Sequence, residues 1–323
     1  MTAWPLVRGS FLIGVFLAAF PLAGAIAAQL TFPPEAPAAL DKIYSFDIDG
    51  AAQDAKQLQS SRPQDPLGFL LEAEALWWRI WCQSAEFKYG MTDARHRPKL
   101  EADQHYLDLT AKALSLAETK IKQGDSARMQ FYAGMANAAA ARLYALRGEN
   151  RSTARTGVRA REHLLRAKVL DPSLADADFG LGLYNYYVDT LSAIARILRF
   201  FMGIPGGSKQ DGIRLLERAI SEGVLTPSVA RFYLALNLHR YDQQYERALS
   251  IVTPLVERYP SNPLFRLARG DLLAKLGRKE QALLCYQAAA ALPVPDPECQ
   301  TRVLGLVHSS IAALNLPTAE YNR

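Results

Sequence analysis

The stretch that decides the fold spans residues 229–290 and reads VARFYLALNLHRYDQQYERALSIVTPLVERYPSNPLFRLARGDLLAKLGRKEQALLCYQAAA. It holds two blocks with no gap between them, and the second begins at Pro263, 34 residues after the first. Small residues such as Gly270 and Ala282 recur where two helices of a hairpin approach closely, and Pro260 ends a second helix. A period of about 34 residues predicts stacked helical hairpins.

The rest of the chain follows the same pattern. Apolar residues recur at three- and four-residue spacing from about residue 36 to 314, and almost no stretch alternates apolar and polar residues as a half-buried strand does. Earlier hairpins are predicted to close at Ala51, Ala55, Leu58 and Pro63, and again at Ala160, Leu164, Ala167 and Pro172. We therefore predict an all-α fold.

The spacing resembles that of the tetratricopeptide repeat family over residues 44–293. The resemblance implies a right-handed α-solenoid of stacked antiparallel helical hairpins, with a groove that holds a partner. The early Trp position of the family is filled here by Phe69, Asp178, Phe232 and Arg266. Inserted turns are predicted near residues 83–99, 149–156 and 187–207, along one edge. Residues 181–223 resemble a subgroup of the family with members in bacterial envelopes, the mitochondrial outer membrane and lipid droplets.

Residues 1–28 have the features of a secretory signal. They carry one charge, Arg8, and an apolar run that is broken at Pro21 and ends in small residues. We expect cleavage after Ala27 or Ala28, with a retained anchor as the alternative. We also expect an N-terminal linker over 29–43, a C-terminal capping helix over 294–316 and a tail over 317–323. A signal places the protein in the periplasm or cell envelope of a bacterium.

The overall composition does not indicate what the protein binds. The formal net charge is only +5 over 323 residues, which does not indicate nucleic acid. Three cysteines are too few for a disulfide framework. Cys82 is interpreted as a small buried side chain, and export would permit a bridge between Cys285 and Cys299.

No motif indicates catalysis, a cofactor or a metal. The run from Gly203 to Lys209 is glycine-rich, but its Lys is misplaced for a phosphate loop and a helix is predicted before it, so nucleotide binding is not expected. Ser208 is instead predicted to cap the next helix, with Asp211 at the capping-box position. The five histidines are isolated, without metal-ligand spacing. We expect a protein that is not an enzyme.

Two surfaces are candidates for binding. The first is the groove, where first helices of the hairpins present a mixed aromatic and polar set that suits an extended protein or peptide segment. Its predicted members are Asp176, Phe179, Leu183, Tyr186, Tyr233, Asn237, Arg240 and Asp271. Some members of the family bind the C-terminal carboxylates of a partner through Lys, Asn and Arg at set positions of the groove. Here Tyr233 stands where the Lys is needed, so the resemblance does not favour such a carboxylate clamp.

The second candidate is the amphipathic segment 191–204, whose wide apolar face must be covered by something. That face comprises Leu191, Ile194, Leu198, Phe201 and Met202. Burial under a neighbouring hairpin is the simplest interpretation, and docking on a membrane surface or a partner helix is the alternative. Likewise, Trp77, Trp78 and Trp81 are predicted to be core beside an inserted loop, or else an aromatic recognition patch. The two hypotheses are thus a protein-binding scaffold and a peripheral membrane or lipid-associated protein.

Overall fold

The protein is described here by a computed structural model that covers residue 1 and residues 31–84, 99–191 and 203–314. The described residues form thirteen α-helices and no strand, so the all-α prediction is confirmed. The helices are α1 (Glu35–Tyr44), α2 (Ile48–Ser61), α3 (Pro66–Ser84), α5 (Glu101–Gln123), α6 (Ala127–Leu146), α7 (Asn150–Leu170), α8 (Asp176–Asp189), α10 (Lys209–Glu222), α11 (Pro227–Arg240), α12 (Tyr245–Arg258), α13 (Pro263–Lys275), α14 (Lys279–Ala290) and α15 (Pro297–Leu314).

Local sequence explains where the helices begin. The Asn262 side chain accepts hydrogen bonds from the backbone N–H groups of Leu264 and Phe265, and Pro263 occupies the first turn, where its missing N–H is not needed. The predicted cap at Ser208 is confirmed, because its hydroxyl accepts from the Asp211 N–H at 3.2 Å. Such caps satisfy N–H groups that a helix end leaves without partners.

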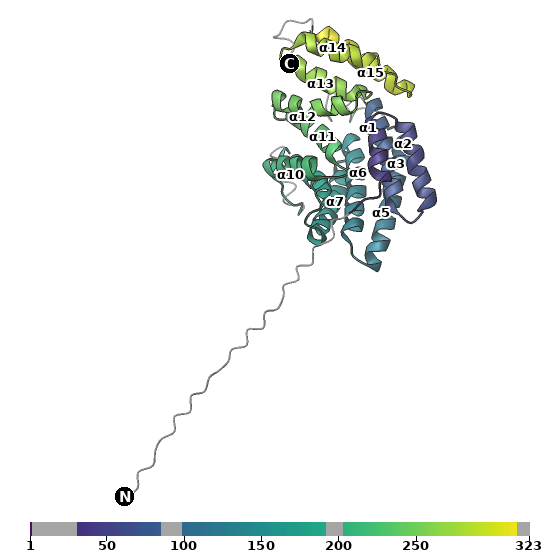
Figure 1. The fold of residues 1–323 in the computed structure, drawn as a ribbon, viewed down its shortest axis with the longest axis vertical. Coiled ribbons are helices and arrows are strands. Elements are labelled where there is room, and N and C mark those ends of the chain that lie inside the picture. Colours follow the sequence, from purple (N-terminus) through teal and green to yellow (C-terminus); the bar gives the residue numbers. More distant parts are fainter. Residues whose placement is uncertain (2–30, 85–98, 192–202, 315–323) are drawn as a thin grey trace.

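The small residues of the repeat allow close packing between neighbouring helices. A Cβ added at Gly270 would lie 2.5 Å from the ring of Tyr286, so α13 and α14 approach as the pattern predicts. Gly182 and Gly212 have the same role between α8 and α10, where an added Cβ would meet backbone of the other helix. Consecutive helices therefore pack against one another along the chain, as Figure 1 shows.

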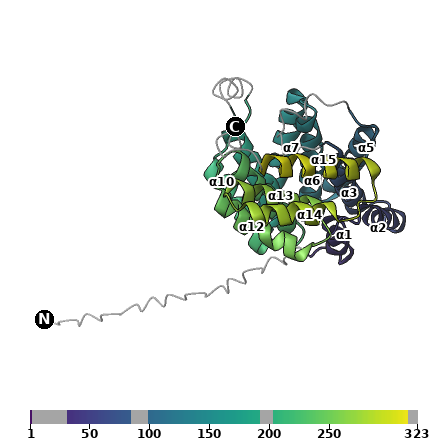
Figure 2. The ribbon, with the colours of Figure 1, turned by 90° about the horizontal axis from the view of Figure 1, so that it is seen from above.

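Alternate helices along the chain also contact one another, and together they form an inner layer. We use this term for α3, α6, α8, α11, α13 and α15. Each packs on the next member in this order, α8 and α11 through the rings of Phe179 and Tyr233, and α15 returns to contact α3. The contacts of the layer consequently form a closed circuit. Figure 2 shows from above how α15 reaches α3.

Helix α1 meets the turn between α12 and α13 through polar contacts. The Asp41 carboxylate accepts a hydrogen bond from the Tyr259 hydroxyl at 2.7 Å and pairs with Arg258. The Asn262 amide donates to the backbone oxygen of Tyr44 at 2.9 Å. Helix α1 thus packs as an integral element, and the prediction that residues 29–43 are a linker is wrong.

A disulfide joins Cys82 of α3 to Cys299 of α15, across 217 residues of sequence. Their Cα atoms are 5.3 Å apart and both residues are buried, while Cys285 is a half-buried free thiol. Cys82 is buried, as predicted, but it is disulfide-bonded, and the bridge that export would permit between Cys285 and Cys299 is not formed. The pairing follows from the closure of the inner layer, which brings α15 against α3.

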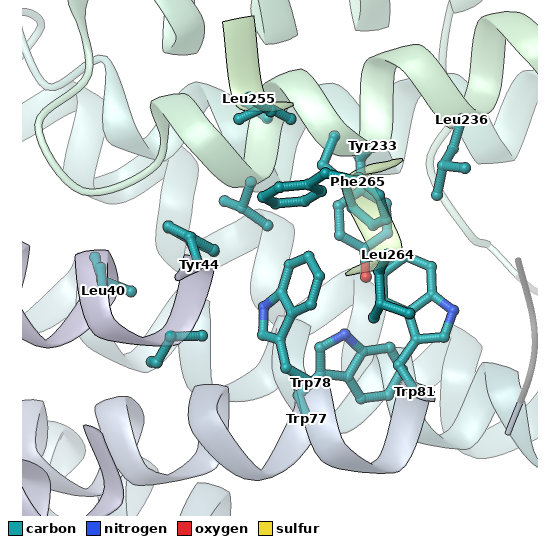
Figure 3. Packing of buried hydrophobic residues seen from close by; sticks show 14 of the residues in the cluster. Leu40, Tyr44, Trp77, Trp78, Trp81, Tyr233, Leu236, Leu255, Leu264 and Phe265 are labelled. Atoms are coloured by element: carbon teal, nitrogen blue, oxygen red, sulfur yellow. The ribbon is translucent and has the colours of Figure 1, made fainter. Parts of the chain in front are cut away.

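Aromatic side chains fill the space inside the closed layer, as Figure 3 shows. The ring of Trp78 lies 5.1 Å from that of Phe232 and 5.5 Å from that of Phe265, and Trp81 lies 5.4 Å from Tyr233. Tilted and edge-on pairs at these distances are favourable contacts beyond their buried area. The tryptophans are core, as predicted, and they join the N-terminal helices to the C-terminal ones.

Of the three predicted inserted turns, the structure describes only one in full. Residues 150–156 belong to α7, so the predicted turn at 149–156 is wrong. Thr153 and Thr156 donate to backbone oxygens one turn earlier, and no proline interrupts the helix there. The segments near 83–99 and 187–207 lie largely outside the described residues. Helix α15 occupies most of the predicted capping helix at 294–316.

Candidate functional site: a polar strip along α11

Most of the side chains predicted to line an open groove are buried. Asp176, Phe179, Tyr186, Tyr233 and Asn237 are each less than a tenth exposed, so their predicted exposure is wrong. The covering groups differ: Trp81 of α3 lies against Tyr233, the turn after α10 covers Asp176, and Asn237 and Asp242 cover Tyr186. Whether these residues bind a partner stays a prediction.

Asp176 has a structural partner within the chain. Its carboxylate accepts hydrogen bonds from the backbone N–H groups of Val224, Leu225 and Thr226 and from the Thr226 hydroxyl, at 2.8–3.1 Å. A carboxylate with this many donors holds the turn between α10 and α11 in place. Asp176 therefore positions α11 and is not available at a surface.

Four of the predicted residues do come together, at the contact of α8 with α11. The ring of Phe179 lies 5.9 Å from that of Tyr233. The Tyr186 hydroxyl lies 3.1 Å from the Asn237 backbone oxygen and donates to Asp242 at 2.8 Å. The remaining three do not share these contacts: Leu183 and Arg240 are half-buried on α8 and α11, and Asp271 accepts from the Tyr286 hydroxyl at 2.7 Å.

A buried ion pair, which the sequence analysis missed, stands beside this contact. Arg142 of α6 pairs with Glu74 of α3 at 2.7 Å, and their side chains are only 15% and 18% exposed. The Arg142 guanidinium lies 4.2 Å above the centre of the Trp77 ring and also donates to the Tyr106 hydroxyl. The Trp78 indole N–H donates to the Glu74 carboxylate at 3.0 Å. Aromatic residues thus enclose the pair on several sides.

We define the polar strip as Glu74, Arg142, Tyr187, Tyr233, Asn237 and Arg240. Tyr233 is close enough to Arg142 to help raise its pKa, Asn237 follows one turn along α11, and Arg240 follows at the end of that helix. The Tyr187 hydroxyl donates to Asn237 Oδ1 at 3.0 Å. The strip therefore runs along α11 from the ion pair to the helix end.

Three buried donors of this region have no acceptor among the described residues. They are Trp77 Nε1, Arg142 Nε and Asn237 Nδ2. A buried N–H without a partner is rare in folded proteins, because leaving it unpaired costs about 1–3 kcal/mol. The strip and the indole beside it consequently have hydrogen-bonding capacity that the described residues do not use.

Burial and neighbouring charges keep Arg142 and Tyr106 in one protonation state near neutral pH. Burial would lower the pKa of Arg142, but the Glu74 carboxylate and nearby tyrosines raise it well above its ordinary value. Burial also raises the pKa of Tyr106 to about 12. Near neutral pH the guanidinium is charged and the hydroxyl is protonated, so both act as hydrogen-bond donors.

The second sequence-predicted surface is only partly described. Leu191 is exposed at the end of α8, whereas Ile194, Leu198, Phe201 and Met202 lie outside the described residues. Among the described helices, none is both long and apolar enough to cross a membrane. Docking on a membrane through 191–204 stays a prediction.

Comparison of the sequence with protein-family models and with curated proteins found no match in either case. The described residues also place no three histidine, cysteine or carboxylate groups where they would hold a metal ion. The chemistry of the polar strip is therefore the main basis for a functional proposal.

Proposed function

We propose that this protein is a non-enzymatic scaffold of the cell envelope that holds a segment of a partner protein along the polar strip. The observation that carries the proposal is the set of three buried donors without acceptors, Trp77 Nε1, Arg142 Nε and Asn237 Nδ2. An acceptor supplied by a bound segment removes the cost of leaving such donors unpaired. A partner that brings acceptors is thereby favoured over one that does not.

The chemistry of the strip favours neutral acceptors. The charge of Arg142 is already balanced by Glu74 at 2.7 Å, so an added carboxylate would meet a neighbouring negative charge. Backbone carbonyls and side-chain amides have no such conflict. The half-buried Tyr187 and Leu183 add apolar surface of the kind that anchors extended peptides. We therefore propose an extended peptide rather than a C-terminal carboxylate as the bound segment.

The proposed architecture is a right-handed, tetratricopeptide-like solenoid that closes on itself. Its support is the 34-residue period and the close helix contact at Gly270. Proteins built from such hairpins commonly bind extended partners on their concave side. Closure narrows the part of that side on which we place the partner to the region of α6, α8 and α11.

An oxidising compartment is also part of the proposal. The pairing of Cys82 with Cys299 supports it, because disulfides persist in exported proteins and are rare in the cytosol. With the predicted signal at residues 1–28, this favours the bacterial periplasm or cell envelope.

Site-specific photo-crosslinking tests the proposal. A photoreactive phenylalanine analogue is placed at Tyr187 or Arg240 of the strip, or at the exposed Arg214 of α10 as the matched control. The full chain is irradiated in cells of its native host, and adducts are identified by mass spectrometry. We expect the same adduct from positions 187 and 240 and not from position 214.

An adduct pattern that is the same at all three positions would mean nonspecific contact and would contradict the proposal. So would a lack of adducts at both strip positions while the variants keep their helicity by circular dichroism. Loss of the shared adduct on Asn237→Asp, which removes the unpaired donor, would add support.

A further inference from the structure

Helix α7 carries a row of arginines on its outer side. Arg151, Arg155 and Arg159 are all exposed and stand four residues apart. At 1.5 Å of rise per residue the row is about 12 Å long, and at 3.6 residues per turn its members share one face. Figure 1 shows α7 at the lower part of the helical array.

Other cations of α7 have partners within the chain. Arg166 pairs with Asp125 at 2.7 Å, Lys168 pairs with Asp178 at 2.9 Å, and Arg161 lies 5.6 Å from the centre of the Tyr184 ring. The three arginines of the row form no ion pair with any described residue. The row is therefore a surface charge that folding does not use.

The position of the row disfavours a stabilising role. Arg151 lies in the first turn of α7, where the helix dipole presents positive charge, and that turn has no acidic residue. A cation in this turn disfavours the helix, because like charges repel. The only acid of α7, Glu162, lies beyond the row.

Apolar side chains extend the same face beyond the arginines. Leu165 is 39% exposed and Val169 is 68% exposed. At 100° per residue, Val169 lies directly in line with Arg151, and Leu165 lies about 40° from that line around the helix axis. One face of α7 thus presents cations in its first half and aliphatic groups in its second.

We propose that this face of α7 docks on an anionic phospholipid surface. Arginines would contact lipid phosphates, while Leu165 and Val169 would enter the boundary between headgroups and acyl chains. A polyanion without apolar groups, such as nucleic acid, would pair with the arginines but would leave Leu165 and Val169 exposed to water. The combination of cations and aliphatic groups therefore favours a lipid surface. This inference does not depend on the polar strip, which lies on the inner layer.

Vesicle flotation of the full chain tests the proposal. Phosphatidylcholine vesicles are compared with vesicles in which about a third of the lipid is phosphatidylglycerol, and the ratio of the two affinities is the readout. This ratio cancels charge-independent insertion by apolar segments elsewhere in the chain. The test variant is Arg151→Gln with Arg155→Gln and Arg159→Gln.

The matched control removes three other exposed arginines that already have acidic partners: Arg214→Gln, Arg247→Gln and Arg278→Gln. Each cation near an anionic surface contributes about fivefold in affinity, so the test variant loses on the order of a hundredfold in the ratio. The control variant keeps most of it.

Two results would overturn the proposal. One is a wild-type chain with equal affinity for both kinds of vesicle. The other is a test variant whose ratio falls no more than that of the control, which would indicate an effect of net charge alone. Val169→Ser, which removes the aliphatic group without adding a charge, gives a further check: it should weaken binding to anionic vesicles, whereas binding to heparin, a polyanion without acyl chains, should change little. A similar loss with heparin would assign the face to a polyanion instead.

Discussion

Removal of the Cys82–Cys299 disulfide should lower stability strongly, because the bridge closes a loop of 217 residues. In the chain-entropy model, a loop of that length restricts the unfolded chain by about 5 kcal/mol at 25 °C. Native disulfides in other proteins contribute about 2–5 kcal/mol. The loss is about 2 kcal/mol if polar contacts such as that of Asp41 with Tyr259 keep the N-terminal and C-terminal helices together in the unfolded or reduced chain.

The assay is scanning calorimetry of the wild type and of Cys82→Ser with Cys299→Ser, each with and without reductant. About 2 °C of melting temperature per kcal/mol is expected for a chain of this size. The wild type should therefore lose about 4–10 °C on reduction, and the double variant should be insensitive to reductant. Cys285→Ser serves as the control and should respond to reductant like the wild type.

Peptide mapping under non-reducing conditions should find Cys82 linked to Cys299 and Cys285 alkylated. A linked Cys285–Cys299 peptide would refute the pairing, and with it the contact of α15 with α3. An unchanged melting temperature on reduction, with the link confirmed by mapping, would refute the entropic reasoning instead.

Three further predictions concern packing, the buried ion pair and pH. Gly270→Leu should destabilise by about 1–3 kcal/mol or more in urea denaturation, because an added Cβ meets a tyrosine ring at 2.5 Å. Gly157→Ala on α7, where a Cβ meets nothing within 4 Å, should instead stabilise by up to about 1 kcal/mol. Arg142→Met should cost about 3–5 kcal/mol because Glu74 is left unpaired, and adding Glu74→Leu should recover part of that loss in a double-mutant cycle. Burial, reinforced by two neighbouring cations, lowers the pKa of His239 to about 4. Since an unfolded histidine titrates near 6.5, the unfolded chain binds more protons between these values. Stability from this residue is thus full above about pH 6.5 and is lost as pH falls towards 4, by up to about 3 kcal/mol, and His239→Gln should remove this dependence.

The local part of the fold was predictable from sequence because its causes are local. The 34-residue period, the small residue at Gly270 and the cap at Ser208 each depend on neighbours within one hairpin. Such signals survive in a single sequence because steric fit and backbone hydrogen bonding act over a few residues. The structure agrees with them at these positions.

The long-range part was not predictable in the same way. Nothing in the sequence says that Trp78 meets Phe232 and Phe265, more than 150 residues later, because aromatic side chains pack with many partners. Closure follows from the rotation between successive packed helices, accumulated along the whole array. Errors in that rotation also accumulate, so the predicted exposure of Tyr233 and Asn237 was wrong although their helix was identified correctly.

The buried ion pair connects these two levels. Replacing a buried pair by apolar residues is often neutral or stabilising, so stability alone gives weak reason to keep Arg142 and Glu74 inside the protein. Helix α3 receives α15 where the inner layer closes, and α6 packs on α3. An arginine that requires Glu74 disfavours closures in which the two groups are separated, because each would then be buried without its partner. The Arg142 guanidinium also lies against the Trp77 ring, and among the described residues Arg142 Nε and the Trp77 indole N–H have no acceptor. A site that is rigid before binding loses little conformational entropy on binding, and this links the closure of the fold to the proposed capture of a partner segment.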